Sequence, residues 1–487
     1  MTDTKSSSNT SSEAGKLGVI GLASIVISSM IGGGIFSLPQ NMAQGASVGA
    51  VLIAWLITGF GMFFIANTFR ILATAKPDLT SGIYMYARDG FGPYVGFSIG
   101  WGYWLCQIFG NVGYAVITMD ALNYFFPGVF TGGNNIASII GGSILIWCFN
   151  FIVLKGVKQA TVLNTIGTIA KLVPLALFII ILAFVFKMDK FDFDFWGDQL
   201  INGKTLGSFG GQLKSTMLVT LWAFIGIEGA VVLSGRAKSQ EIVGKATFLG
   251  FIGCLVVYVL LSILPYGLLT QSQLASIPNP STAGVLEKVI GKPGAWIMNI
   301  GLLVAVLSSW LSWTLISAEM PYAMAKNGNF PEIFKKENSA GSPSVSLWIT
   351  SIVMQLAMFL VYFSSNAWNT MLSVTGVMVL PAYFMSTAYL WKIVEDNDYS
   401  KDINIGRATA LITGILGCVY ALWLIYAAGL KYLLMAIVFF TIGIPVFVWN
   451  QRQNKGTISF CEKTIMVILI LLSIFAIYAF ARGLIKL

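Results

Sequence analysis

Two apolar segments of the chain are interrupted by glycine in corresponding places, at Gly32, Gly33 and Gly34 in the first and around Gly226 in the second. Glycine inside a helix costs about 1 kcal/mol relative to alanine, so three in a row predict that the first segment unwinds. Unwinding leaves bare N–H groups at the start of one half-helix and bare C=O groups at the end of the other. Such groups suit a carboxylate and an ammonium, respectively. Close helix–helix contact through small residues is the alternative interpretation.

Glu228, Glu319 and Lys171 are ionisable side chains within or at the edge of apolar segments. A charge at mid-membrane costs about 2.5–3.5 kcal/mol on insertion scales, so such residues are expected to be functional. Glu228 lies in the second break, where its carboxylate could pair with a cation, carry a proton, or bond to freed backbone amides. Glu319 is expected nearer the cytoplasmic mouth, in a gate or a structural ion pair. Lys171 is expected to pair with a carboxylate or to extend its ammonium to the interface.

Two tryptophans and two amides complete the set of candidate binding residues. Trp222 precedes the second break by about one turn, and Trp313 has a comparable depth in a later segment. An indole face attracts Lys or Arg groups through a cation–π contact worth about 2 kcal/mol in a dehydrated site; a role in packing is the alternative. Gln107 and Asn111 lie in a long apolar run, where each could hydrogen-bond a bound molecule or a neighbouring helix.

The elements that must position these residues are apolar runs of about twenty residues, the length that crosses a bilayer as a helix. We predict thirteen spans, with approximate bounds 17–39, 47–75, 94–121, 136–153, 160–186, 209–234, 242–268, 295–325, 345–363, 369–394, 408–428, 431–450 and 464–483. The last one is the least certain, because an interfacial helix is also consistent with its sequence.

The spans divide into two blocks of five, each of which opens with a broken helix. Residues 17–186 form the first predicted repeat and residues 209–394 the second, and residues 408–487 add helices 11–13. An odd number of spans in each block inverts the second copy relative to the first. In membrane proteins built this way, the two broken helices create a binding site near the bilayer midplane.

Composition supports a polytopic membrane protein. The 487 residues are 56% hydrophobic and only 10% charged, with a mean hydropathy of +0.80, whereas soluble domains carry about 25% charged residues. The absence of histidine excludes His-based triads and His-containing metal sites. The five cysteines form no CxxC pair, no nucleotide-binding GxxxxGK[ST] motif occurs, and the basic residues are too scattered for nucleic acid. We therefore expect no metal, no cofactor and no enzymatic activity.

Lys and Arg placement predicts the orientation in the cell (inner or plasma) membrane. With a cytoplasmic N-terminus, the inside segments hold 19 Lys and Arg residues and the outside segments 9, in agreement with the positive-inside rule. Residues 1–16 are polar and Ser-rich and are expected to be a disordered cytoplasmic tail, without a cleavable signal peptide.

The sequence resembles the basic amino acid/polyamine antiporter family of the amino acid–polyamine–organocation superfamily over about residues 16–450. The resemblance rests on SSMIGGGIFSLPQNMA (28–43), GFGPYVGF (90–97), YWLCQIFGN (103–111), LWAFIGIEGA (221–230), SWTLISAE (312–319) and AKNGNFPEIFKKEN (325–338). Within that family the chain is most similar to arginine–ornithine antiporters. The resemblance implies an all-α, LeuT-like fold with the five-plus-five arrangement and a site between helices 1, 3, 6, 8 and 10.

By resemblance, the segment Ile31 to Gly34 (Ile31, Gly32, Gly33, Gly34) holds a substrate carboxylate, and the carbonyls of Trp222, Ala223 and Ile225 hold the amino group. Trp222 and Trp313 flank the substrate side chain, Cys106, Gln107 and Asn111 line it, and Thr375 or Ser373 adds a polar contact from helix 10. Glu228 matches a family glutamate linked to gating. Better-known family members have a serine at the position of Gly33, so contacts to the carboxylate from helix 1 are expected from backbone only.

The implied activity is exchange of a cationic amino acid for its metabolic product by alternating access, of the arginine/ornithine type. Histidine/histamine exchange, lysine/cadaverine exchange and proton-coupled amino acid import are the alternatives. A membrane enzyme or a nutrient receptor is disfavoured, because the chain has neither a catalytic motif nor a signalling domain. The expected partners are small cationic substrates and the lipid bilayer, and a homodimer is left open.

Overall fold

The computed structural model describes residues 18–79, 82–198, 205–232, 238–396, 398–399 and 405–485, so the predicted N-terminal tail (1–16) lies outside the described residues. The described chain is helical and contains no strand. Its α-helices are α2 (Val19–Met30), α3 (Leu38–Ala43), α4 (Val48–Ala75), α5 (Ile83–Phe91), α6 (Pro93–Phe125), α7 (Ile136–Leu154), α8 (Val157–Val185), α9 (Met188–Asp192), α10 (Phe209–Ala223), α11 (Gly229–Val232), α12 (Gln240–Ile263), α13 (Gln271–Ala275), α14 (Ser281–Ile290), α15 (Lys292–Lys326), α16 (Ser344–Val361), α17 (Ala367–Glu395), α18 (Arg407–Gln453) and α19 (Phe460–Ala481).

Nine of the described helices are long and apolar enough to cross a membrane: α4, α6, α7, α12 and α15 to α19. The predicted all-α membrane fold is confirmed. The predicted spans 408–428 and 431–450 are the two helical halves of α18, which meet at a kink at Gly429, where φ is 78° and ψ is 158°. Glycine adopts this non-helical conformation without the steric cost that a Cβ atom would bring, so the chain changes direction between the two halves.

The first predicted break is confirmed. Helix α2 ends at Met30, and Gly32 is extended with φ −96° and ψ −163°. The chain then resumes as the 3₁₀-helix η1 (Gly33–Ser37), which continues into α3. A helix that is interrupted in this way presents unpaired backbone groups on both sides of the gap.

The second predicted break is confirmed as well. Helix α10 ends at Ala223, and five residues pass before α11 begins at Gly229. Gly226 has φ +108°, a conformation that L side chains rarely adopt, and a Cβ atom there would lie 2.8 Å from the carbonyl carbon of Ser29. The two breaks therefore pack directly against each other, with Ser29 Oγ 2.8 Å from the Gly226 carbonyl oxygen.

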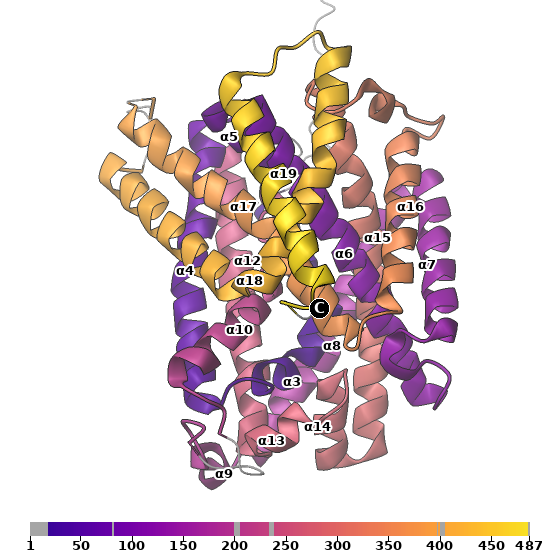
Figure 1. Ribbon diagram of the computed structural model, residues 1–487. Coiled ribbons are helices and arrows are strands. Elements are labelled where there is room, and N and C mark those ends of the chain that lie inside the picture. The colour runs from indigo at the N-terminus through magenta and orange to yellow at the C-terminus, as the bar shows by residue number, and fades with distance from the viewer. Residues whose placement is uncertain are drawn as a thin grey trace, which may run out of the picture.

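The two ends of the molecule carry different short helices (Figure 1). Helices α3, α9, α13 and α14 gather at the lower end of the view, and α5 lies at the upper end. Helix α14 holds the second half of the first broken helix, because Thr282 Oγ1 donates to the Phe36 carbonyl (3.0 Å) and Gln40 N donates to Ser281 Oγ (3.1 Å).

The thirteenth predicted span forms α19, which packs beside the second half of α18 (Figure 1). Thr441 Oγ1 lies 3.2 Å from the Leu469 carbonyl oxygen between these two helices. A capping box of Ser459 and Glu462 begins α19. Most of its surface is exposed and apolar, as expected of a helix that faces lipid.

Candidate functional site

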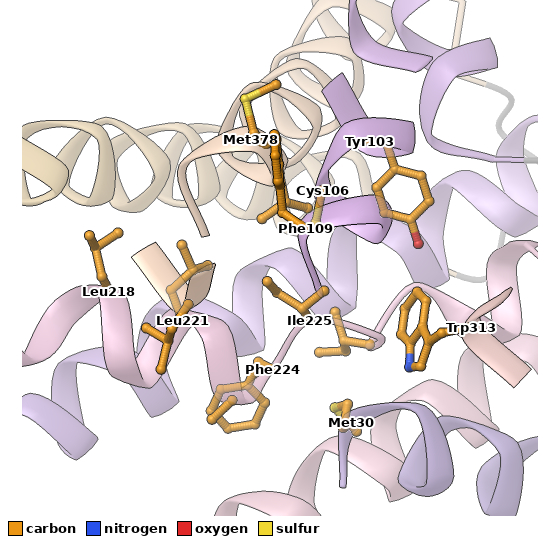
Figure 2. Packing of buried hydrophobic residues seen from close by; sticks show 14 of the residues in the cluster. Met30, Tyr103, Cys106, Phe109, Leu218, Leu221, Phe224, Ile225, Trp313 and Met378 are labelled. Atoms are coloured by element: carbon orange, nitrogen blue, oxygen red, sulfur yellow. The ribbon is translucent and has the colours of Figure 1, made fainter. Parts of the chain in front are cut away.

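A cavity with about 430 Å³ of space free of protein atoms lies where the two breaks meet α6, α15 and α17. The residues that line it are Ser29, Met30, Gly32, Cys106, Gln107, Gly110, Asn111, Tyr114, Trp222, Ile225, Trp313 and Thr375. Figure 2 shows Met30, Ile225 and Trp313 around this space, together with Tyr103 and Cys106 of α6.

Helix 1 contributes to the cavity differently from the prediction. Of the four residues expected to hold a carboxylate, Gly32 lines the cavity, whereas Ile31, Gly33 and Gly34 are buried and do not. A Cβ at Gly33 would lie 2.2 Å from a methyl of Val306, and one at Gly34 would lie 1.6 Å from the Trp222 ring. These two glycines are therefore required for close packing.

The break in helix 6 supplies two of its three expected residues. Trp222 and Ile225 line the cavity, whereas Ala223 is buried outside it. The break itself is stabilised by short-range backbone bonds, including Ile225 N to the Trp222 carbonyl at 3.2 Å and Ile227 N to the Phe224 carbonyl at 3.1 Å. The Trp222 carbonyl therefore already accepts one bond and retains its second lone pair.

Three neutral polar side chains face the cavity with unused hydrogen-bonding capacity. Both amide atoms of Gln107 are buried without a hydrogen-bond partner, as are Asn111 Oδ1 and Thr375 Oγ1. Asn111 Nδ2 donates to Ser317 Oγ at 3.0 Å, which joins α6 to α15. Asn111 therefore makes the predicted interhelical bond and still leaves an acceptor for a ligand. Ser373, the alternative to Thr375, lies outside the cavity.

Both predicted tryptophans line the cavity. Trp313 extends from α15 and is 7% exposed. Trp222 is half-buried, and its ring contacts Trp368 edge to face, with 5.5 Å between the ring centroids. A second, wider hollow of about 1,050 Å³ is lined by residues of α3, α10, α17 and α18, including Leu218, one turn before Trp222. Leu218 lines this hollow and Trp222 lines the cavity, so the two linings are one helical turn apart along α10.

Glu228 is the centre of a buried cluster on the other side of the cavity. Its carboxylate accepts hydrogen bonds from Tyr103 Oη of α6 (2.6 Å) and Tyr383 Oη of α17 (3.0 Å). It also lies 3.2 Å from the backbone N of Gly226, in the break. The predicted bond to a freed backbone amide is therefore present. Glu228 does not line the cavity, so the contact with a cationic ligand is not made directly in this conformation.

Lys171 is fully buried, and neither predicted role describes its surroundings. Its ammonium donates to the Ser28 carbonyl (2.7 Å), Ser28 Oγ (3.0 Å) and Ser309 Oγ (3.2 Å). No carboxylate among the described residues forms a salt bridge with it. The positive charge lies at the carboxyl end of α2, where it complements the helix dipole and satisfies a carbonyl freed by the break. Glu319 is half-buried on α15, outside the cavity.

Polar contacts close the end of the molecule that carries α5. Arg88 Nη1 donates to the Asn327 carbonyl at the end of α15 (2.6 Å), and Lys392 Nζ donates to the Gly90 carbonyl (2.6 Å). Lys76 forms an ion pair with Asp398. At the opposite end, Asn369 Nδ2 of α17 donates to Gln44 Oε1 (2.9 Å). The structure thus has contacts across both ends of the cavity.

Sequence reasoning missed four of the cavity residues: Ser29, Met30, Gly110 and Tyr114. Ser29 and Met30 immediately precede the glycine triplet, so their position beside the break was a usable signal. Gly110 and Tyr114 share a helical face with Gln107 and Asn111, at spacings of three and four residues. Tyr103 and Tyr383 carried no such signal, because each is one aromatic residue among many in an apolar helix.

Comparisons with known proteins agree with this geometry. A family model described as amino acid permease matches residues 17–430. The chain is similar to a protein named arginine/agmatine antiporter from Chlamydia pneumoniae, with 63% identity over 487 residues and 99% of each chain covered. The protein of that name from Chlamydia abortus is 63% identical over 484 residues, which is 99% of this chain and 100% of that protein. That from Chlamydia trachomatis serovar D is 59% identical over 470 residues, 96% of this chain and 97% of that protein.

Proposed function

This chain belongs to the amino acid permease family, whose fold is LeuT-like, and we propose that it exchanges arginine for a cationic product of arginine across a cell membrane. The curated relatives are named for agmatine, the decarboxylated form of arginine, and we take agmatine as the counter-substrate. Ornithine, the product suggested by the sequence resemblance, has the same α-amino acid head group as arginine and is the first alternative. On this proposal the protein is a transporter and catalyses no covalent step.

The observation that carries the proposal is a cavity formed by both helix breaks, two tryptophans and three neutral polar side chains with unpaired atoms. The lining residues include no charged side chain. A cationic side chain is therefore recognised by the Trp222 and Trp313 ring faces and by amide or hydroxyl acceptors. Without a fixed carboxylate in the cavity, release requires no ion pair to be broken, which suits a site that must load and unload in every cycle.

Alternating access then follows from the contacts at the two ends. We propose that helices 1, 2, 6 and 7 (α2–α3, α4, α10–α11 and α12) rock against helices 3, 4, 8 and 9 (α6, α7, α15 and α16) around the cavity. Residues 17–186 and 209–394 are the inverted repeats. On this proposal, Trp222 separates the cavity from the hollow beside α3 and α10. The cluster of Glu228, Tyr103 and Tyr383 closes the side of the cavity opposite Trp222, because its hydrogen bonds join the break in helix 6 to α6 and α17.

The orientation proposed from Lys and Arg placement is a cytoplasmic N-terminus. It puts the α5 end, with Arg88, Lys76 and Lys392, on the cytoplasmic side. The Glu228 cluster is then the inner gate and the Trp222 side is the outer gate. Both the monomer and a homodimer are compatible with this assignment, since the cavity is lined by a single chain.

Counterflow in reconstituted vesicles tests the proposal. Labelled arginine should enter vesicles that contain arginine or agmatine and should not enter empty ones, because the unloaded carrier reorients slowly. Uptake into empty vesicles under a proton gradient would instead support the import alternative. Competition by unlabelled arginine, agmatine, ornithine, lysine, cadaverine, histidine and histamine then identifies the substrate pair.

A further inference from the structure

The break in helix 1 lacks a side-chain donor for a substrate carboxylate. Gly32, Gly33 and Gly34 have no side chains, and Ser29 Oγ is already engaged within 2.9 Å of two backbone carbonyls, those of Val26 and Gly226. No cationic side chain lines the cavity either. An α-carboxylate beside this break would therefore depend on backbone N–H groups unless another element supplies a donor.

Tyr114 of α6 lies where such a donor is needed. It lines the cavity and is 7% exposed. Its hydroxyl approaches the break so closely that a Cβ atom on Gly32 would lie 2.3 Å from Oη. None of the described residues forms a hydrogen bond with this hydroxyl, although phenol groups in dehydrated surroundings normally have a partner. The ring is thus packed against glycine with its polar atom available to a ligand.

Two of the other neutral polar side chains, those of Gln107 and Asn111, lie earlier on the same helix. Gln107 and Asn111 precede Tyr114 by about two turns and one turn, so along α6 the hydroxyl is the group nearest to the end that carries Phe125. A molecule with one charge at each end can therefore contact acceptors at Gln107 and Asn111 and a donor at Tyr114. Arginine carries a guanidinium cation at one end and a carboxylate at the other, whereas agmatine has no carboxylate.

We infer that Tyr114 Oη donates a hydrogen bond to the α-carboxylate of the bound amino acid and so distinguishes amino acids from decarboxylated amines. The inference rests on the proposed function, because it assumes that the cavity binds arginine. Tyr114 contributes to the affinity for arginine and not to that for agmatine. It therefore sets the ratio of the two affinities.

Calorimetry on the purified full-length protein tests this inference with three ligands: arginine, agmatine and argininamide, in which an amide replaces the carboxylate. A hydrogen bond to a charged group is strong enough that Tyr114→Phe should raise the Kd for arginine at least about tenfold. The Kd for agmatine should stay within about twofold of the parent, and the Kd for argininamide should rise less than that for arginine, because its amide oxygen accepts only a neutral hydrogen bond. Unchanged agmatine binding also shows that the variant is folded.

Tyr258→Phe is the matched control, because Tyr258 Oη is buried without a partner but lies outside the cavity. It should leave all three Kd values unchanged. Equal weakening of arginine and agmatine by Tyr114→Phe, or no weakening of arginine, overturns the inference while leaving the proposed exchange intact. If the parent protein binds neither arginine nor agmatine, the proposed function fails and this assignment fails with it.

Discussion

On the proposal that the Glu228 cluster is the inner gate, opening of the cavity toward the α5 end separates Glu228 from Tyr103 and Tyr383, and removal of one phenol hydroxyl should favour the open state. The bond from Tyr103 Oη is 2.6 Å long and buried, and a hydrogen bond to a charged group contributes about 1.5–3 kcal/mol. Tyr103→Phe should therefore raise the equilibrium constant for opening by about tenfold to a hundredfold. Tyr383→Phe, which removes the 3.0 Å bond, should have the smaller effect.

Cys106 provides the assay, because its thiol lines the cavity and is only 1% exposed. With the other cysteines replaced by serine (Cys148, Cys254, Cys418 and Cys461), a charged, membrane-impermeant thiol reagent can react only there. Applied from the α5 side of oriented vesicles, the reagent should label Tyr103→Phe about tenfold faster than the parent. Labelling from the opposite side should not become faster, and saturating arginine should slow it in both proteins.

Tyr420→Phe is the control for the chemical change, since Tyr420 Oη is buried, has no partner and lies outside the cluster. It should label at the parent rate. If Tyr103→Phe and Tyr383→Phe also label at the parent rate, while arginine still protects Cys106, the cluster is not the inner gate.

Three further substitutions test separate parts of the site. Trp222→Leu removes a cation–π surface worth about 2 kcal/mol and should weaken arginine binding about thirtyfold in calorimetry; unaltered affinity would contradict a stacking role. Lys171→Met leaves the Ser28 carbonyl without its buried donor, and loss of a charged hydrogen bond should lower the free energy of unfolding by about 1.5–3 kcal/mol; a thermal-unfolding midpoint equal to that of the parent would show that the ammonium is not needed there. Gly226→Ala forces a Cβ into a conformation with φ +108° and against Ser29, at a cost of about 1–3 kcal/mol, so its midpoint should fall while Gly210→Ala, with open space around the added methyl, leaves it unchanged.

The sequence predicted the spans and both breaks because their signals are local. A run of about twenty apolar residues and a glycine triplet can be recognised without knowledge of what surrounds them. The same holds for Trp222, Ile225 and Gly32, which lie in or beside a break and line the cavity. Residues on other helices that resembled a known family pattern, such as Asn111 and Trp313, were also placed there by the structure.

Contacts between helices could not be predicted from those signals. Glu228 lies 125 residues after Tyr103 and 155 residues before Tyr383 in the sequence. Only the packing of α6 and α17 against the break brings the three side chains together. Lys171 was expected to find a carboxylate because charge pairing is the simplest rule for a buried ammonium. The carbonyl that it contacts instead is available only because α2 ends at Met30.

The bond between Ser29 and Gly226 has a consequence for how faithfully the protein couples its two substrates. It joins the two helices at their breaks, so a displacement of one helix also displaces the other. If the two helices moved independently, the cavity could open to both sides of the membrane at once, and the substrate gradients would be lost. A shared contact of this kind favours concerted motion, which is what a carrier needs if every inward passage is to be matched by one outward.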